Sequence, residues 1–161
     1  MGLRNRLTDL QMKTMSVLHR AVLTASGGRL LASFGSMPAV ELHTIGRSSG
    51  KRRTTMLTAP VHGHQRFVLI ASKGGDDRHP QWYLNLVANP DVELTVNGST
   101  LKLRARTASP AEKAELWPQI VAAYRGYEGY QQKTDRDIPV VICEPRTRGP
   151  GARTGSADRE C

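Results

Sequence analysis

The amino-acid sequence predicts a mainly β fold with attached helices, of the α+β class, whose strands form an antiparallel sheet. Six short segments rich in β-branched residues are separated by turn-forming residues, as expected for strands. Two of them flank Asn97-Gly98 and alternate apolar with polar residues, which is typical of a hairpin with one buried face. The sequence Ser109-Pro110-Ala111-Glu112 has the form of a capping box with proline at the first helical position, so a helix should follow that hairpin.

The N-terminal segment is predicted to be a basic amphipathic helix from Leu7 to Ala25, because its apolar residues recur at spacings of about three to five. Gly27-Gly28 would end this helix, and we expect the globular part to begin at Pro38. Residues 1–37 are therefore predicted to form a helix and a linker ahead of a domain that spans residues 38–145.

Within this domain the strands are predicted in the order Val40–Ile45, Thr54–Val61, Phe67–Ser72, Val92–Val96, Thr100–Arg106 and Ile138–Cys143. A short helix is predicted at Gln81–Ala88. The helix that starts after Ser109 should break or restart at Pro118, before Tyr124, because proline disrupts a helix interior. After Pro145 the chain has almost no apolar residues, so residues 146–161 are predicted to be a disordered basic tail.

Composition indicates one intracellular domain with a positive surface. The chain has 161 residues, with 23 Lys and Arg against 14 Asp and Glu, which should attract phosphates, polyglutamate, nucleic acid or acidic lipid. Its two cysteines, Cys143 and Cys161, are too few for a disulfide framework and indicate a reducing compartment. No segment resembles a secretory signal or a membrane span, so we expect a cytoplasmic protein.

A basic loop between two predicted strands is a candidate anion site. Gly46-Arg47-Ser48-Ser49-Gly50-Lys51-Arg52-Arg53 combines flexible glycines, two hydroxyls and four cations. Its spacing does not match a P-loop, because Arg52 follows the lysine, so nucleoside triphosphate hydrolysis is disfavoured. From charge alone, a solvated hairpin turn fits equally well.

Two other segments could meet a ligand. Ser72 and Lys73 end a predicted strand before two glycines, so a hydroxyl and a cation could lie beside accessible backbone. Trp82 could place an indole against a flat ring, although core packing is the commoner role of such a residue.

Three of the four tyrosines, Tyr124, Tyr127 and Tyr130, recur every three residues and should share one face. Such spacing usually means packing, but Gly126 and Gly129 weaken a regular helix and favour a mobile lid. Three phenols could hold a flat ligand and donate hydrogen bonds to it.

Metal and hydrolase chemistry find little support in the sequence. His62 and His64 bracket Gly63 in a predicted hairpin turn, and no third ligand has a convincing position. No serine has a matching base and acid, and Cys143 lies in a predicted buried strand. We therefore expect no metal cofactor.

The order of these segments resembles the actinobacterial deazaflavin-dependent nitroreductase family, including its quinone-reductase-like members. The resemblance runs from about Val40 to Pro145 and includes Ala-Ser-Lys-Gly-Gly, His-Pro-Gln-Trp-Tyr-Leu-Asn-Leu, the tyrosine cluster and Thr-Asp-Arg-Asp-Ile-Pro-Val-Val, in that order. It implies a split β-barrel of the flavin-reductase or FMN-binding type that binds coenzyme F420.

By position, the resemblance implies cofactor contacts on two segments and an acceptor pocket on a third. Its phosphate and glutamate tail would meet Arg47, Ser48, Ser49 and Arg53 of the basic loop. Ser72 and Lys73 would meet the deazaflavin end, with Trp82 near the ring and Tyr124 at both the cofactor and the acceptor. Tyr124, Tyr127 and Tyr130 would line the acceptor side, and the candidate catalytic residues are Tyr127 and Ser72. Ser48 and Gln81 replace the lysine and methionine that are common in relatives.

Hydride transfer from reduced F420 to a quinone, or to a similar conjugated or nitroaromatic acceptor, is the function that this resemblance implies. The basic N-terminal helix could contact an anionic membrane at its inner face, or pack on the barrel instead. Two alternatives remain open from the residues. One is an FMN-binding reductase of the same fold, and the other is a non-catalytic module for nucleic acid or other polyanions, although we expect no nucleic-acid partner.

Overall fold

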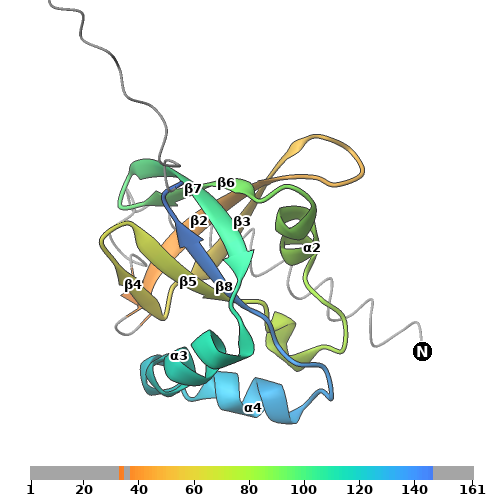
Figure 1. Ribbon diagram of the computed structural model, residues 1–161, viewed down its shortest axis with the longest axis vertical. Coiled ribbons are helices and arrows are strands. Elements are labelled where there is room, and N and C mark those ends of the chain that lie inside the picture. The colour runs from red at the N-terminus through yellow and green to blue at the C-terminus, as the bar shows by residue number, and fades with distance from the viewer. Residues whose placement is uncertain (1–32, 35–36, 147–161) are drawn as a thin grey trace, which may run out of the picture.

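The computed structural model describes residues 33–34 and 37–146 (Figure 1). The predicted N-terminal helix from Leu7 to Ala25 lies outside the described residues, as does the predicted basic tail beyond Arg146.

The strands form one curled antiparallel sheet of eight strands (Figure 1). Its order is β1-β2-β6-β7-β8-β5-β4, and β3 pairs with β2 beside this path. The strands are β1 (Ser33–Phe34), β2 (Met37–Ile45), β3 (Arg52–Thr58), β4 (Val61–Gly63), β5 (Arg66–Ile70), β6 (Asp91–Val96), β7 (Ser99–Thr107) and β8 (Val140–Glu144). The helices are the 3₁₀ turn η1 (Lys73–Gly75) and the α-helices α2 (Gln81–Ala88), α3 (Pro110–Ala123) and α4 (Gly126–Gln132). The predicted antiparallel sheet and the bounds of α2 are confirmed.

Strands β5 and β8 are buried on both faces, which explains why their sequences are continuously apolar rather than alternating. On one face, Leu69 and Val141 pack in a core that includes Leu86 of α2. On the other face, Val68 and Ile142 pack in a second core that includes Ile120 of α3. Accordingly, α2 lies on one side of the sheet, and α3 and α4 lie together on the other (Figure 1).

Two local signals behave as the sequence predicts. Asn97 and Gly98 have φ values of 49° and 79° and turn β6 into β7, with Val96 opposite Ser99. The Ser109 hydroxyl accepts from the Glu112 backbone amide, and the Glu112 side chain accepts from the Ser109 amide, as in a capping box.

The other predicted strands differ from the structure by one to three residues at their ends, and two predictions are wrong in kind. The segment Thr54–Val61 is not one strand, because β3 ends at Thr58 and Pro60, which cannot donate a ladder hydrogen bond, precedes β4. Pro118 does not break its helix either, since α3 runs through it. Ala114 and Pro118 are both exposed, so water can reach the carbonyl left unpaired by the proline, while buried neighbours hold the helix to the sheet.

Candidate functional site

The basic loop, residues 46–53, consists of a tight turn after β2 and the first two residues of β3. Its backbone closes through hydrogen bonds from the Gly46 amide to the Lys51 carbonyl (2.8 Å) and from the Gly50 amide to the Gly46 carbonyl (2.8 Å). The Ser49 hydroxyl accepts from the Lys51 amide at 3.3 Å and lies 3.5 Å from Nη2 of Arg53. The side chains from Arg47 to Arg53 are exposed. Arg52 pairs with Glu93 at 2.7 Å, whereas Arg53 lies beside the Ser49 hydroxyl, an arrangement that suits an anion.

Asn85 of α2 fixes one end of the basic loop. Its Oδ1 accepts from the backbone amide of Arg47 at 3.2 Å and from Nη1 of the same residue at 3.1 Å. Asn85 is buried, and the loop passes above α2 in Figure 1. The helix therefore sets the direction of the Arg47 guanidinium.

The 72–76 turn, from Ser72 to Asp76, follows β5 and contains η1. Lys73, Gly74 and Gly75 all have positive φ values, of 47°, 66° and 83°. Lysine pays a steric cost of about 1–2 kcal/mol in this region, and such backbone strain tends to occur where a site needs it. The position of a Cβ at Gly74 has no atom within 4 Å, so the backbone there is open to a ligand.

A carboxylate balances the cations beside this turn. Oδ2 of Asp76 lies 3.9 Å from Nζ of Lys73 and 2.8 Å from Nη2 of Arg78. The hydrogen bond from the Arg78 side chain lowers the pKa of Asp76 to about 2. Asp76 is therefore ionised at neutral pH and holds the Lys73 side chain against the turn.

The structure brings the three tyrosines of the tyrosine cluster together: Tyr124 at the end of α3 and Tyr127 and Tyr130 on α4. Ring centroids are 5.4 Å apart for Tyr124 and Tyr127, and 6.2 Å apart for each of the other two pairs. The hydroxyls of Tyr124 and Tyr130 lie 3.4 Å apart. Tyr127 is buried, and its hydroxyl lies 3.2 Å from Oγ1 of Thr58 at the end of β3.

The phenols of Tyr127 and Tyr130 stay protonated at neutral pH. Burial raises the pKa of Tyr127, and the hydrogen bond with Tyr124 raises the pKa of Tyr130 to about 12. A protonated phenol can donate a hydrogen bond to an oxygen that gains negative charge.

Strand β3 connects the basic loop to the tyrosine cluster. Arg53 stands near its start and Thr58 at its end, and five steps along an extended strand span roughly 17 Å. One strand thus carries cations at one end and a buried phenol contact at the other.

Trp82 lies in the apolar core rather than in the tyrosine cluster. Its side chain is 7% exposed, and its ring meets that of Tyr83 edge-on at 6.3 Å. Core packing, the commoner role, describes this position, and contact with a ligand ring stays a prediction.

Sequence reasoning missed Thr58, Asn85 and Arg136, each of which holds a predicted site residue in place. Asn85 and Arg136 stand in two segments that carry the family resemblance, Trp-Tyr-Leu-Asn-Leu and Thr-Asp-Arg-Asp-Ile-Pro-Val-Val, and this position was the only indication of their roles. No local pattern marked Thr58.

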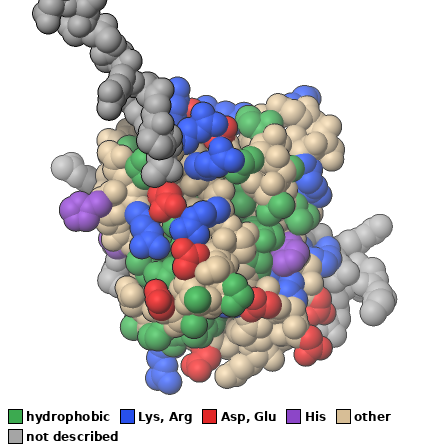
Figure 2. All heavy atoms as spheres, viewed as in Figure 1, with side chains coloured by type: hydrophobic (Ala, Val, Ile, Leu, Met, Phe, Trp, Pro, Cys, Tyr) green, Lys and Arg blue, Asp and Glu red, His purple; other side chains and the backbone are tan. Residues whose placement is uncertain are grey.

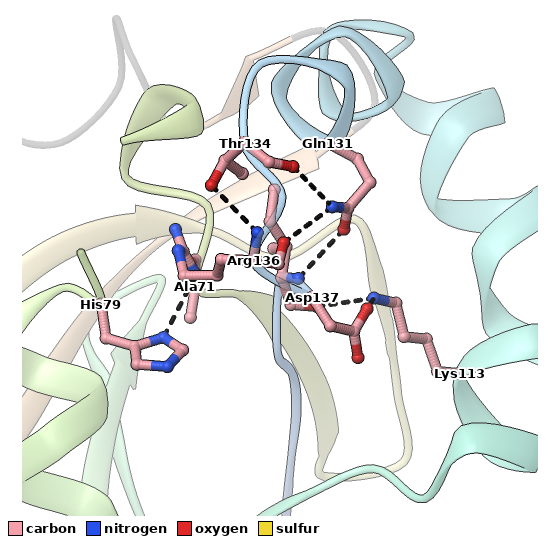
Figure 3. A network of polar contacts seen from close by, with 8 residues as sticks. Ala71, His79, Lys113, Gln131, Thr134, Arg136 and Asp137 are labelled. Atoms are coloured by element: carbon pink, nitrogen blue, oxygen red, sulfur yellow. Dashed lines mark hydrogen bonds and ion pairs between the residues drawn. The ribbon is translucent and has the colours of Figure 1, made fainter. Parts of the chain in front are cut away.

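The site also contains a histidine whose titration should affect stability. Burial, and then the charge of Arg136, lower the pKa of His79 below its ordinary value. Nη1 of Arg136 donates to Nδ1 of His79 at 3.2 Å, and His79 is therefore neutral in this contact (Figure 3).

His79 is expected to destabilise the fold as pH falls below about 6.5, because an unfolded chain takes up the proton first. The free energy of unfolding should be unaffected by His79 above that pH, should fall as pH drops from about 6.5 toward the folded-state pKa, and should level off below it. Asparagine can accept from Arg136 without titrating. Urea unfolding at about pH 7 and about pH 5 should show a smaller loss in His79→Asn than in the wild type. The same substitution at exposed His62 should leave the loss unchanged.

Figure 2 shows that on one face of the molecule Lys and Arg side chains gather mainly in the upper half of the view and acidic side chains mainly in the lower half.

Within residues 33–34 and 37–146, no three His, Cys, Asp or Glu side chains are placed to hold a metal ion. Over the same residues, no helix has the length and apolar character needed to cross a membrane.

Comparison with known proteins assigns the chain to a family. The family model for F420H(2)-dependent quinone reductases matches residues 15–145. The chain belongs to this family. A Mycobacterium tuberculosis protein named as an F420H(2)-dependent quinone reductase is 40% identical over 134 residues, which cover 80% of this chain and 89% of the relative. A second M. tuberculosis protein, named as a putative F420H(2)-dependent quinone reductase, is 37% identical over 73% of this chain and 99% of its own length.

Solved structures agree with this assignment. An F420H2-dependent reductase is 42% identical, with a TM-score of 0.61 over 66% of this chain and 94% of the other. A domain-swapped dimer is 34% identical, with a TM-score of 0.63 over 85% of this chain and 98% of the other. The predicted α+β split β-barrel, the enzyme class and coenzyme F420 are confirmed, and the chain is an F420-dependent oxidoreductase. Neither the FMN nor the polyanion alternative fits these findings.

Proposed function

We propose that this chain transfers a hydride from F420H2 to a quinone, with nitroaromatic compounds as side acceptors. The observation that carries the proposal is the 3.2 Å contact between the Tyr127 hydroxyl and Thr58, because it ties the tyrosine cluster to the strand that starts in the basic loop. The names of the mycobacterial relatives support a quinone as the acceptor.

The chemistry of the two cofactor segments fits coenzyme F420. Its phosphate and glutamate tail carry negative charge, and Arg47, Ser48, Ser49 and Arg53 are exposed and offer cations and hydroxyls. We assign these four residues to the tail. Ser72 and Lys73 would hold the deazaflavin end, where the open backbone at Gly74 leaves room for a ligand to approach. The Ser72 side chain is nearly buried, which suits a hydroxyl that orients one polar atom.

Bound F420H2 supplies the hydride, which with one proton reduces a quinone to a hydroquinone. The chain must therefore orient the acceptor, exclude water and stabilise charge on the acceptor oxygen. Tyr127 is suited to the last task because its buried phenol remains protonated, and Thr58 fixes its hydroxyl. Tyr124, which is exposed, and Tyr130, which is partly exposed, would enclose the acceptor and leave it a way in.

Titration of the purified protein tests the cofactor assignment directly. Tryptophan fluorescence should change saturably with F420 and not with FMN at the same concentrations. Oxidation of F420H2, followed by absorbance, should then require an added quinone. A protein that binds FMN and ignores F420 would contradict the proposal.

Replacing Lys73 by alanine is expected to weaken F420 binding about tenfold, because one charge-assisted contact of about 1.5 kcal/mol is lost. Lys102→Ala removes the same charge from an exposed position on β7 and should bind F420 like the wild type. The dissociation constants are measured by the same fluorescence titration. Equal binding by Lys73→Ala and Lys102→Ala would show that the 72–76 turn does not hold the cofactor.

We also propose that residues 38–145 form the F420-binding unit, and that residues 1–37 and 146–161 flank it. A cytoplasmic location follows from the reducing compartment that the cysteine content indicates. Contact of the basic N-terminal segment with anionic membranes would place the site near membrane quinones. Sedimentation with anionic vesicles, comparing the full chain with one that lacks residues 1–32, tests this contact, and equal sedimentation would contradict it.

A further inference from the structure

Arg136 lies in the segment between α4 and β8, and its guanidinium donates hydrogen bonds to the backbone of the 72–76 turn and of the preceding residue, Ala71. Nη2 donates to the Ser72 carbonyl at 2.9 Å, Nη1 to the Ala71 carbonyl at 3.1 Å, and Nε to the Asp76 carbonyl at 3.0 Å. Nη1 also meets Nδ1 of His79, at 3.2 Å (Figure 3). These carbonyls lie on both sides of the left-handed Lys73, so one rigid fork fixes the turn at its start and at its end.

The partners of this guanidinium are carbonyl oxygens rather than carboxylates. The charges of Asp76 and Asp77 act on Arg136, but the hydrogen bonds of its guanidinium go to backbone carbonyls and to His79. A salt bridge could form with a flexible side chain and leave the backbone free. Hydrogen bonds to three carbonyls instead restrict the backbone itself, which is what a strained turn requires.

The backbone of Arg136 is held from the side of α4. Nε2 of Gln131 donates to the Arg136 carbonyl at 2.8 Å, and Oε1 of Gln131 accepts from the Ile138 amide at 3.0 Å. The buried Thr134 hydroxyl accepts from the Arg136 amide at 3.2 Å (Figure 3). Gln131 belongs to the helix that carries Tyr127 and Tyr130. The 72–76 turn and the tyrosine helix are therefore fastened to the same short segment.

We propose that Arg136 is a positioning residue that holds the 72–76 turn in the conformation that binds the cofactor and fixes the position of the turn relative to the tyrosines of α4. The inference rests on the proposed function, in which the turn holds the deazaflavin end and the tyrosines hold the acceptor. Arg136 acts through Ser72 and Lys73 and is not assigned a contact with the cofactor.

Arginine is required at this position because lysine offers a single ammonium group on a flexible chain. Arg136→Lys keeps the charge but cannot reach three carbonyls in one plane. It should weaken F420 binding about tenfold, the effect of about one lost charge-assisted hydrogen bond. Arg66→Lys is the matched control, because Arg66 is exposed at the start of β5. It should bind F420 like the wild type.

Two readouts separate positioning from a general loss of stability. Without cofactor, amide hydrogen exchange in Arg136→Lys should speed up in residues 72–76 and remain unchanged in β6 and β7. Guanidinium ion at tens of millimolar should restore part of the F420 affinity of Arg136→Ala, and the same concentration of urea should not. Gln131→Ala should show the same local exchange effect, while Gln132→Ala, on an exposed neighbour, should not.

The outcomes distinguish this inference from the proposed function. If Lys73→Ala weakens F420 binding and Arg136→Lys does not, the turn binds the cofactor but Arg136 does not position it. If Lys73→Ala also binds normally, the assignment of the turn to the cofactor fails, and this inference falls with it. Unchanged exchange of residues 72–76 in Arg136→Lys overturns the positioning role of Arg136 whatever the binding results are.

Discussion

Replacing Gly75 by alanine is expected to lower the free energy of unfolding by about 2–4 kcal/mol and to weaken F420 binding more than any substitution on the basic loop. A Cβ at Gly75 would lie 2.9 Å from the Tyr130 carbonyl oxygen and 2.9 Å from Cβ of Lys133. Backbone cannot yield as a side-chain tip does, so α4 must move away. The φ of 83° adds a steric cost of its own. Urea unfolding measures the first effect and fluorescence titration the second.

Gly74 provides the matched control for this prediction. Its φ of 66° is equally left-handed, but a Cβ there would meet no atom within 4 Å. Gly74→Ala should therefore cost only the backbone term of about 1–2 kcal/mol. If both variants lost the same stability, the close approach of α4 to the turn would not explain the loss at Gly75.

Local sequence signals predicted the elements of this fold well because their causes are local. Asn97-Gly98 determines the β6–β7 hairpin through two left-handed residues, and the capping box starts α3 through contacts within one helical turn. The same reasoning failed at Pro118, where the outcome depends on burial. The helix continues because its proline faces water while Leu116 and Ile120 remain packed.

The sequence indicated which segments form the candidate site, but it did not indicate which residues contact one another there. Family resemblance located the basic loop, Ser72-Lys73 and the tyrosines, but the residues that hold them are distant in sequence. Arg136 reaches Ser72 across 64 positions, and Tyr127 reaches Thr58 across 69. No periodicity or motif encodes such pairings, because they arise only when the sheet curls and brings α4 beside the end of β3.

In the proposed mechanism the Tyr127 hydroxyl donates to the acceptor oxygen, so Tyr127→Phe is expected to lower kcat about 100-fold. The substitution keeps the ring in its buried packing and removes the donor to the acceptor oxygen. It should leave the dissociation constant of F420 unchanged, because the basic loop and the 72–76 turn remain intact. Stopped-flow reduction of a soluble quinone by F420H2, at saturating cofactor, measures the effect.

Tyr83→Phe is the control, since Tyr83 is the fourth tyrosine and its hydroxyl meets Thr107 at 3.0 Å, outside the cluster. Its kcat should match that of the wild type.

The kcat of Thr58→Val should lie between those of the wild type and Tyr127→Phe, because Tyr127 keeps its proton but loses the partner that fixes its hydroxyl. Burial raises the pKa of Tyr127, so the kcat of the wild type should not begin to fall at about pH 10, where an ordinary tyrosine ionises. If Tyr127→Phe kept full kcat, proton donation to the acceptor would have to come from Tyr130, Tyr124 or water, and the Thr58 contact would then serve packing alone.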